Sequence, residues 1–137
     1  MPVLVDTSVL IDIAVRDPDW LSWSRHRLER MRKDGSVLIN QIIYSEFSMR
    51  YETIDEVDAL LPEDVFRREG LPWEAAFAAS RAFALYRRRG GAREKVLPDF
   101  LIGAHATIRG YAILTRDPSG YRTYFPALEI IAPDTHP

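Results

Sequence analysis

The sequence contains no cysteine, and this absence excludes disulfide bonds, thiolate zinc sites and cysteine nucleophiles together. It also lacks a run of about 18 apolar residues, the length that a membrane-spanning helix needs. The N-terminus lacks the basic and then apolar layout of a signal peptide, so we expect the protein in the cytoplasm. There is no glycine-rich phosphate loop, and the three histidines lack the spacing of a histidine metal site.

The composition is that of an ordinary globular protein, with 47% apolar and 28% charged residues. A chain of 137 residues can bury a real core, so we expect a single domain over residues 1–137. The net charge of -2 hides two basic stretches, at 25–33 and 81–95, on either side of an acidic stretch at 52–69. Basic stretches could hold a polyanion, although a solvated helix face is their commoner explanation.

Short apolar segments alternate with helical patterns along the chain. Residues 2–5, 37–39 and 112–114 are unbroken apolar runs typical of strands buried on both faces, and 128–131 is a last strand. Apolar spacing and start and stop signals predict helices after residue 8 and at 17–33, 41–50, 53–61, 72–89 and 100–109, with a weak extended segment at 65–68. This alternation predicts an α/β fold, a three-layer α/β/α sandwich around a mostly parallel sheet.

Asp6 follows the first predicted strand directly, and Thr7 or Ser8 could cap the helix after it. Open parallel sheets bind ligands just beyond the carboxyl ends of their strands, which is where Asp6 would lie. An aspartate in this place can also serve only to start a helix. Taken alone, Asp6 does not distinguish the two roles.

Three further acids occupy comparable places, each with an alternative structural role. Glu46 is the only acid of the helix after the second strand, where it could be an ordinary surface residue. Asp99 follows Pro98 in the first turn of a helix that is apolar nearly all round, where it could merely compensate the helix dipole. On the same face, Gly103 would let another segment or a ligand come close. Asp117 lies after the third strand, where it could form an Asx turn with the predicted turn beyond it.

The four acids carry more weight together than any one does alone. Right-handed crossovers between parallel strands would bring three of these element ends to one edge of the sheet. Carboxylates that converge in a cleft repel one another, so such a site favours a bound cation. Oxygen ligands in a chain without cysteine favour Mg²⁺ or Mn²⁺, and such a centre can activate water for attack on a phosphodiester.

Other polar residues give weaker signals. His105 lies in a helix that we expect to be buried, so a hydrogen-bonded core histidine is the expected role. Tyr44, Tyr51, Tyr121 and Tyr124 could stack on bases, but packing in the core or at its rim is the commoner role.

In order along the chain, four motifs resemble those of PIN-domain ribonucleases: VDTS at 5–8, SE at 45–46, PDFLIGAHA at 98–106 and LTRD at 114–117. The segment YRTYFP at 121–126 is similar to the end of bacterial VapC toxins. This resemblance covers the whole chain. It implies a PIN-like fold and a Mg²⁺-dependent RNA endonuclease, the toxin of a toxin–antitoxin pair. It also implies a homodimer, and a cognate VapB-like antitoxin whose C-terminal segment occupies the cleft.

On this reading Asp6 and Asp99 bind the metal directly, and Glu46 and Asp117 complete the catalytic cluster. Thr7 and Thr115 orient carboxylates or the attacking water. The substrate would be a structured RNA of the tRNA or rRNA class. The second basic stretch supplies candidate RNA contacts that no motif assigns, namely Arg87, Arg88, Arg89 and Arg93, and Arg116 is a further candidate.

Three alternatives stay open. A housekeeping PIN-domain nuclease that processes RNA would share the chemistry and differ in its biology. A non-catalytic RNA- or protein-binding module could share the fold, although the intact acids argue against it. An aspartyl phosphotransferase of the haloacid-dehalogenase kind would use Asp6 as a nucleophile, but it requires an acid where Ser8 stands.

Overall fold

A computed structural model describes residues 1–91 and 96–137 of the chain. Its strands form one parallel sheet in the order β3-β2-β1-β4-β5. In chain order they are β1 (Val3–Val5), β2 (Val37–Ile39), β3 (Phe66–Arg68), β4 (Ala112–Leu114) and β5 (Ile130–Ile131). Because the first strand is central and the chain winds outward to both edges, the carboxyl ends of all strands meet at one edge of the sheet.

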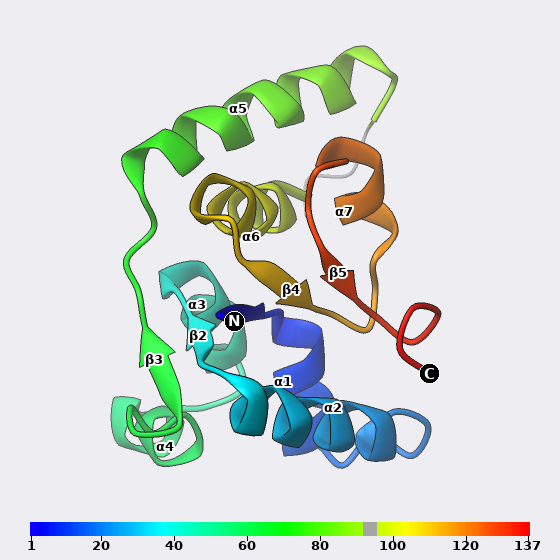
Figure 1. Cartoon of the computed structure of the whole chain (residues 1–137). Coiled ribbons are helices and arrows are strands. Elements are labelled where there is room, and N and C mark those ends of the chain that lie inside the picture. The colour runs from blue at the N-terminus through cyan, green and yellow to red at the C-terminus, as the bar shows by residue number, and fades with distance from the viewer. Residues whose placement is uncertain (92–95) are drawn as a thin grey trace.

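Helices cover both faces of this sheet (Figure 1). Those of the described ranges are α1 (Thr7–Ala14), α2 (Leu21–Asp34), α3 (Gln41–Ser48), α4 (Ile54–Leu60), α5 (Trp73–Arg88), α6 (Val96–Arg109) and α7 (Ser119–Tyr124). In Figure 1, α5, α6 and α7 lie above the sheet, and α1, α2 and α4 lie below it. Helix α3 contacts both α1 and α6. The predicted three-layer α/β/α fold is therefore confirmed.

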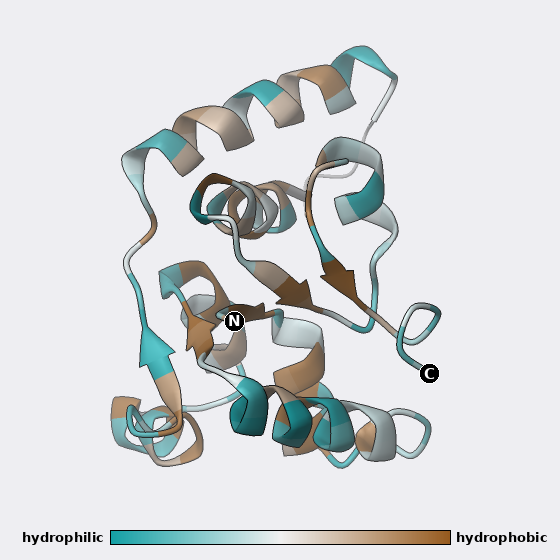
Figure 2. Cartoon of the chain, viewed as in Figure 1, coloured by the Kyte–Doolittle hydropathy of each residue, from teal (hydrophilic) through white to brown (hydrophobic). Residues whose placement is uncertain are grey.

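The core lies along the central strands and the helices that pack on them. Every residue of β1, β2 and β4 is buried, which explains why these strands have no alternation of polar and apolar residues. Figure 2 shows these strands in brown and the outward side of α2 in teal. None of the helices in the described ranges is long and apolar enough to span a membrane.

The structure differs from the sequence-based expectations at several element ends. The N-cap of α1 is Asp6 itself, in an extended conformation, rather than Thr7 or Ser8. Its side chain makes no capping bond because its oxygens accept hydrogen bonds from other side chains. Helix α6 begins at Val96, before Pro98, rather than at Phe100. Asp99 lies in its first turn, as the sequence predicts.

Two elements were predicted incompletely. The weak extended segment at 65–68 contains β3, a true strand that pairs with β2. Only Phe66 of this strand is buried, which is why the apolar signal is weak there. Residues 118–120 were expected to form a turn, but α7 begins at Ser119 with Pro118 as its N-cap. A turn and the first turn of a short helix favour the same residues, so the sequence does not separate them.

Candidate active site

Asp6, which directly follows β1, has a buried carboxylate that accepts hydrogen bonds from three hydroxyl groups. Ser8 Oγ and Thr115 Oγ1 each donate a hydrogen bond of 2.8 Å to Asp6 Oδ2. The hydroxyl of Tyr121 donates a bond of 2.9 Å to Asp6 Oδ1. These three bonds fix the orientation of the carboxylate, and Asp6 is only 6% exposed, so it is largely removed from water.

Glu46 lies in α3 beside the first turn of α1. Thr7 Oγ1 donates a hydrogen bond of 2.8 Å to Glu46 Oε1, which joins the two helices. Desolvation by partial burial raises the pKa of the Glu46 carboxyl, and the negative charge of Asp6 raises it further, while the bond from Thr7 acts in the opposite direction. Glu46 and Asp6 are therefore close enough to repel each other.

Asp99, in the first turn of α6, has the most perturbed carboxyl group of the site. Desolvation, followed by the negative charges of Asp6, Glu46 and Asp117, raises its pKa from 3.8 to about 7. Much of the residue is open to solvent, yet the surrounding protein still removes enough water to disfavour its charged form. The other three predicted acids thus all lie within electrostatic reach of Asp99.

Asp117 follows β4 and is exposed, and Thr115 connects it to Asp6. The hydroxyl of Thr115 donates to Asp6 and accepts a bond of 3.0 Å from the backbone N–H of Asp117. A single side chain therefore fixes both one carboxylate and the backbone of the next.

No ion pair involves any of the four acids among residues 1–91 and 96–137, although the charge of Asp117 reaches Arg116, which is itself paired with Asp12. Within the same ranges, no three potential ligand side chains converge closely enough to form a ready-made metal site. The donors are all oxygens of carboxylates that raise the pKa of Asp99 by repulsion, which fits a hard divalent cation. Binding would require these side chains to move closer together.

Tyr121 and Ser8 are site residues that the sequence did not identify. The Tyr121 side chain is buried, and desolvation, followed by the charges of Asp6 and Asp99, raises its pKa well above the usual value of a phenol. It therefore stays a hydrogen-bond donor. Ser8 was considered as a helix cap and as part of the VDTS motif but was given no role toward Asp6, although a hydroxyl two residues after an aspartate could have suggested a local bond. Nothing in the sequence pairs Tyr121 with Asp6.

Arg116, one of the candidate RNA contacts, is engaged inside the protein. Its Nε lies 2.9 Å from Asp12 Oδ2 and its Nη2 lies 3.0 Å from Asp12 Oδ1. Asp12 is 1% exposed and also accepts a bond of 2.9 Å from Ser24 Oγ. The pair ties the end of β4 to α1, which gives Arg116 a structural role, and its contact with RNA stays a prediction.

Three of the other candidate RNA contacts, Arg87, Arg88 and Arg89, lie at the end of α5. Arg89 lies 5.9 Å from the centroid of the Tyr124 ring, and Tyr124 lines a small hollow of about 60 Å³ together with Asp99 and Tyr121. This places Arg89 on the same side of the molecule as the acids. Of the remaining candidates, Arg87 and Arg88 are exposed and Arg93 lies outside the described residues.

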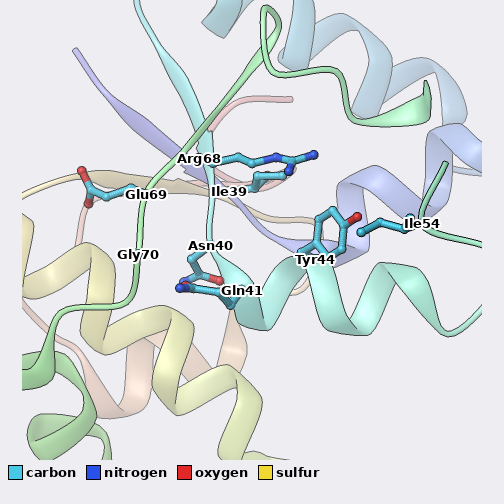
Figure 3. A pocket seen from close by; sticks show the side chains of 8 residues that line it. All are labelled: Ile39, Asn40, Gln41, Tyr44, Ile54, Arg68, Glu69 and Gly70. Atoms are coloured by element: carbon cyan, nitrogen blue, oxygen red, sulfur yellow. The ribbon is translucent and has the colours of Figure 1, made fainter. Parts of the chain in front are cut away.

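A larger pocket, of about 340 Å³, opens where β2 and β3 end (Figure 3). In Figure 3 the neighbouring residues Arg68 and Glu69 point in opposite directions. Arg68 extends toward Tyr44, with its guanidinium carbon 5.1 Å from the ring centroid, and it forms an ion pair of 2.7 Å with Asp58. The charges on this side of the pocket are thus paired within the protein.

Glu69, on the other side, belongs to a buried network. His105 Nε2 lies 2.7 Å from Glu69 Oε2, and the hydroxyl of Tyr111 donates a bond of 2.6 Å to Glu69 Oε1. Asn40 Oδ1 accepts from the backbone N–H of Ile43, so its amide nitrogen faces His105 Nδ1, 2.9 Å away. This pattern assigns the ring proton to Nε2, and His105 is the hydrogen-bonded core histidine that the sequence predicts.

The family model for the PIN domain matches residues 3–126. No curated protein sequence matches the chain.

Several solved structures share the fold. VapBC2 from Rickettsia felis, bound to a promoter DNA fragment, superposes with a TM-score of 0.74 at 15% identity. VapBC-1 from nontypeable Haemophilus influenzae gives 0.72 at 13%, and DNA-bound VapBC from Salmonella typhimurium gives 0.71 at 18%. Each alignment covers 96% of this chain and 98% of the other. At such identities the likeness is one of fold.

Proposed function

The chain belongs to the PIN-domain family, and on this premise we propose that it is a metal-dependent endoribonuclease, the toxin of a VapBC-like toxin–antitoxin pair. PIN domains are typically hydrolytic nucleases and generally use a divalent metal ion. The observation that carries the proposal is the group of four carboxylates that form no ion pair in the described ranges. Desolvation, followed by the charges of the other three acids, raises the pKa of Asp99 to about 7, and a bound cation would relieve the repulsion among them.

Asp6 and Asp99 would hold Mg²⁺ or Mn²⁺ directly, and Glu46 and Asp117 would complete the site. Such an ion neutralises charge on a phosphodiester and activates the attacking water. Thr7 would keep Glu46 oriented through its bond of 2.8 Å. Thr115 would hold the Asp6 carboxylate and the backbone of Asp117 in a fixed relative position through its two hydrogen bonds.

The proposed substrate is a structured RNA of the tRNA or rRNA class, hydrolysed at a phosphodiester bond. The exposed arginines at the end of α5 support this, since arginines in such places commonly bind the phosphate backbone. Arg89 is the best placed of them because it packs over Tyr124, which lines the same hollow as Asp99.

The proposed partner is a VapB-like antitoxin, and the proposed oligomer is a homodimer. The support is fold likeness: the solved neighbours named above are VapBC complexes, and two of them are bound to DNA. Expression of a toxin should arrest growth, and co-expression of the antitoxin from a neighbouring small gene should restore it. A housekeeping RNA-processing nuclease would show no such rescue.

The decisive test of the activity is Asp99→Asn, assayed on a broad RNA panel with Mg²⁺ or Mn²⁺. We expect cleavage to fall at least about 100-fold. Residues that only orient a metal ligand typically cost about 10- to 100-fold when they are replaced, so this loss lies at or beyond the upper end of their range. Glu29→Gln is the matched control, because it removes an exposed carboxylate on α2 and should leave cleavage unchanged. Sequencing of RNA 5′ ends after induction of the wild type and of Asp99→Asn would identify the target, because new ends should appear with the wild type and be absent with the variant.

Chelation by EDTA should abolish cleavage by the wild type. Full activity of Asp99→Asn, or cleavage that survives EDTA, would contradict the proposal.

A further inference from the structure

The hydrogen bonds to Asp6 are distributed unequally between its two oxygens. Each carboxylate oxygen offers about two lone pairs. Asp6 Oδ2 accepts two bonds of 2.8 Å, from Ser8 and Thr115, so both of its lone pairs are in use. Among the described residues, Asp6 Oδ1 accepts one bond, of 2.9 Å, from the hydroxyl of Tyr121. One lone pair of Oδ1 therefore stays open.

We infer that Tyr121 is a positioning residue for Asp6, which it restricts to binding a cation through the open lone pair of Oδ1. The three hydroxyls fix the carboxylate from both ends, so Asp6 cannot rotate to offer both oxygens without breaking at least one of these bonds. The inference deepens the proposed function and rests on it, because it concerns how a proposed metal ligand is held.

The place of Tyr121 depends on close packing between α7 and α6. A Cβ added at Gly103 would lie 2.6 Å from Cε2 of Phe125 and 3.1 Å from Cδ1 of Tyr121. Any larger residue at Gly103 would therefore displace the two rings that bring the Tyr121 hydroxyl to Asp6. The close approach that the sequence predicts at Gly103 is made by these side chains.

A positioning role has a signature that a packing role lacks. Residues that orient a metal ligand through a hydrogen bond typically change metal affinity or activity about 10- to 100-fold when they are replaced. A residue that only fills space changes the stability of the protein and leaves metal affinity unchanged. Tyr121→Phe separates the two roles because it removes the hydroxyl and keeps the ring.

The experiment is a calorimetric titration with Mn²⁺ at pH 8 on the full chain. We expect Tyr121→Phe to bind Mn²⁺ about 10- to 100-fold more weakly than the wild type, and the Mn²⁺ concentration for half-maximal RNA cleavage to rise by the same factor. Tyr111→Phe is the matched control, since it also removes a phenol hydroxyl that donates to a carboxylate, Glu69, in the other hydrogen-bond network. It should bind Mn²⁺ as the wild type does.

A second variant reaches Tyr121 from the other side. Gly103→Ala keeps every hydroxyl but pushes the ring away, so it should also weaken Mn²⁺ binding, with thermal unfolding confirming that it folds. Unchanged or tighter Mn²⁺ binding by Tyr121→Phe would overturn the inference while leaving the proposed function intact. Equal losses in Tyr121→Phe and Tyr111→Phe would overturn it as well. A wild type that binds no Mn²⁺ would overturn the proposed function and the inference together.

Discussion

Two polar clusters lie at the same edge of the sheet, and they differ in how their charges are balanced. At the ends of β2 and β3, Glu69 accepts from Tyr111 and lies 2.7 Å from His105 Nε2. Partial burial alone would raise the pKa of Glu69, but the bonds from Tyr111 and His105 outweigh it, so this pKa is lowered. At the ends of β1 and β4, Asp6 receives only hydroxyl donors among the described residues, and Asp99 has a pKa raised to about 7.

The comparison shows that position at a strand end does not by itself make a functional site. Both clusters are hydrogen-bonded and partly buried, and both join strand ends to helices. The Glu69 cluster pairs its charge within the protein and so contributes to stability. The Asp6 cluster gathers like charges that no ion pair balances within the described residues, and a bound cation would neutralise them. A carboxyl group that has a perturbed pKa and forms no ion pair within the described residues distinguishes a candidate active site from a structural network.

The largest effect on stability is expected in the balanced cluster, for His105→Ala. The change opens a cavity at a fully buried position and removes one hydrogen-bond partner each from the side-chain amide of Asn40 and from Glu69 Oε2. We expect the free energy of unfolding to fall by about 3–5 kcal/mol, measured by urea denaturation. Tyr111→Phe, which removes one bond to Glu69, should cost only about 1 kcal/mol. Equal effects of the two variants would show that the histidine does not organise the network.

The sequence predicted the parts of the molecule that local patterns encode. Three central strands were predictable because each is an apolar run with no alternation, and β3 was weak because two of its three residues are exposed arginines. The four acids were predictable because Asp6 and Asp117 follow strands, Asp99 begins a helix, and Glu46 is the only acid of its helix. Their electrostatic coupling follows from the fold and confirms nothing about their roles, which stay proposals.

The contacts that distinguish the clusters were not predictable. Tyr121 is 115 positions from Asp6, and the alternation of elements fixes neither the packing of α7 nor the direction of one hydroxyl. Arg116 was considered as an RNA contact because nothing local indicates that Asp12, 104 positions away, would be its partner. Such pairings depend on three-dimensional packing, which short motifs do not record.

A smaller effect, of opposite sign, is expected in the unbalanced cluster for Asp99→Asn without metal. Because the pKa of Asp99 is raised to about 7, the folded state keeps a proton that the unfolded state releases above its ordinary pKa of 3.8. The wild type therefore loses stability as the pH rises from about 4 to 7, and the loss is complete above that range. Asparagine cannot ionise, so the variant should have a higher Tm than the wild type at pH 8 and a similar Tm near pH 3.5.

Thermal unfolding in EDTA at the two pH values checks this prediction. The difference should be modest, because Asp99 is partly exposed and solvent screens its charge. An Asp99→Asn variant that is less stable than the wild type at pH 8 would show that the carboxylate is compensated within the protein.

The most direct measurement is a calorimetric Mn²⁺ titration at pH 8 of the wild type, Asp99→Asn and Glu69→Gln, which compares carboxylates from the two clusters. We predict that the wild type binds Mn²⁺ and that Glu69→Gln keeps this affinity. Asp99→Asn should lose at least about 100-fold in affinity, more than the usual loss for a residue that only orients a metal ligand. At pH 6 the wild type should bind about tenfold more weakly, because Asp99 is then mostly protonated. A wild type that binds no Mn²⁺, or an Asp99→Asn variant that binds it equally well, would contradict the account.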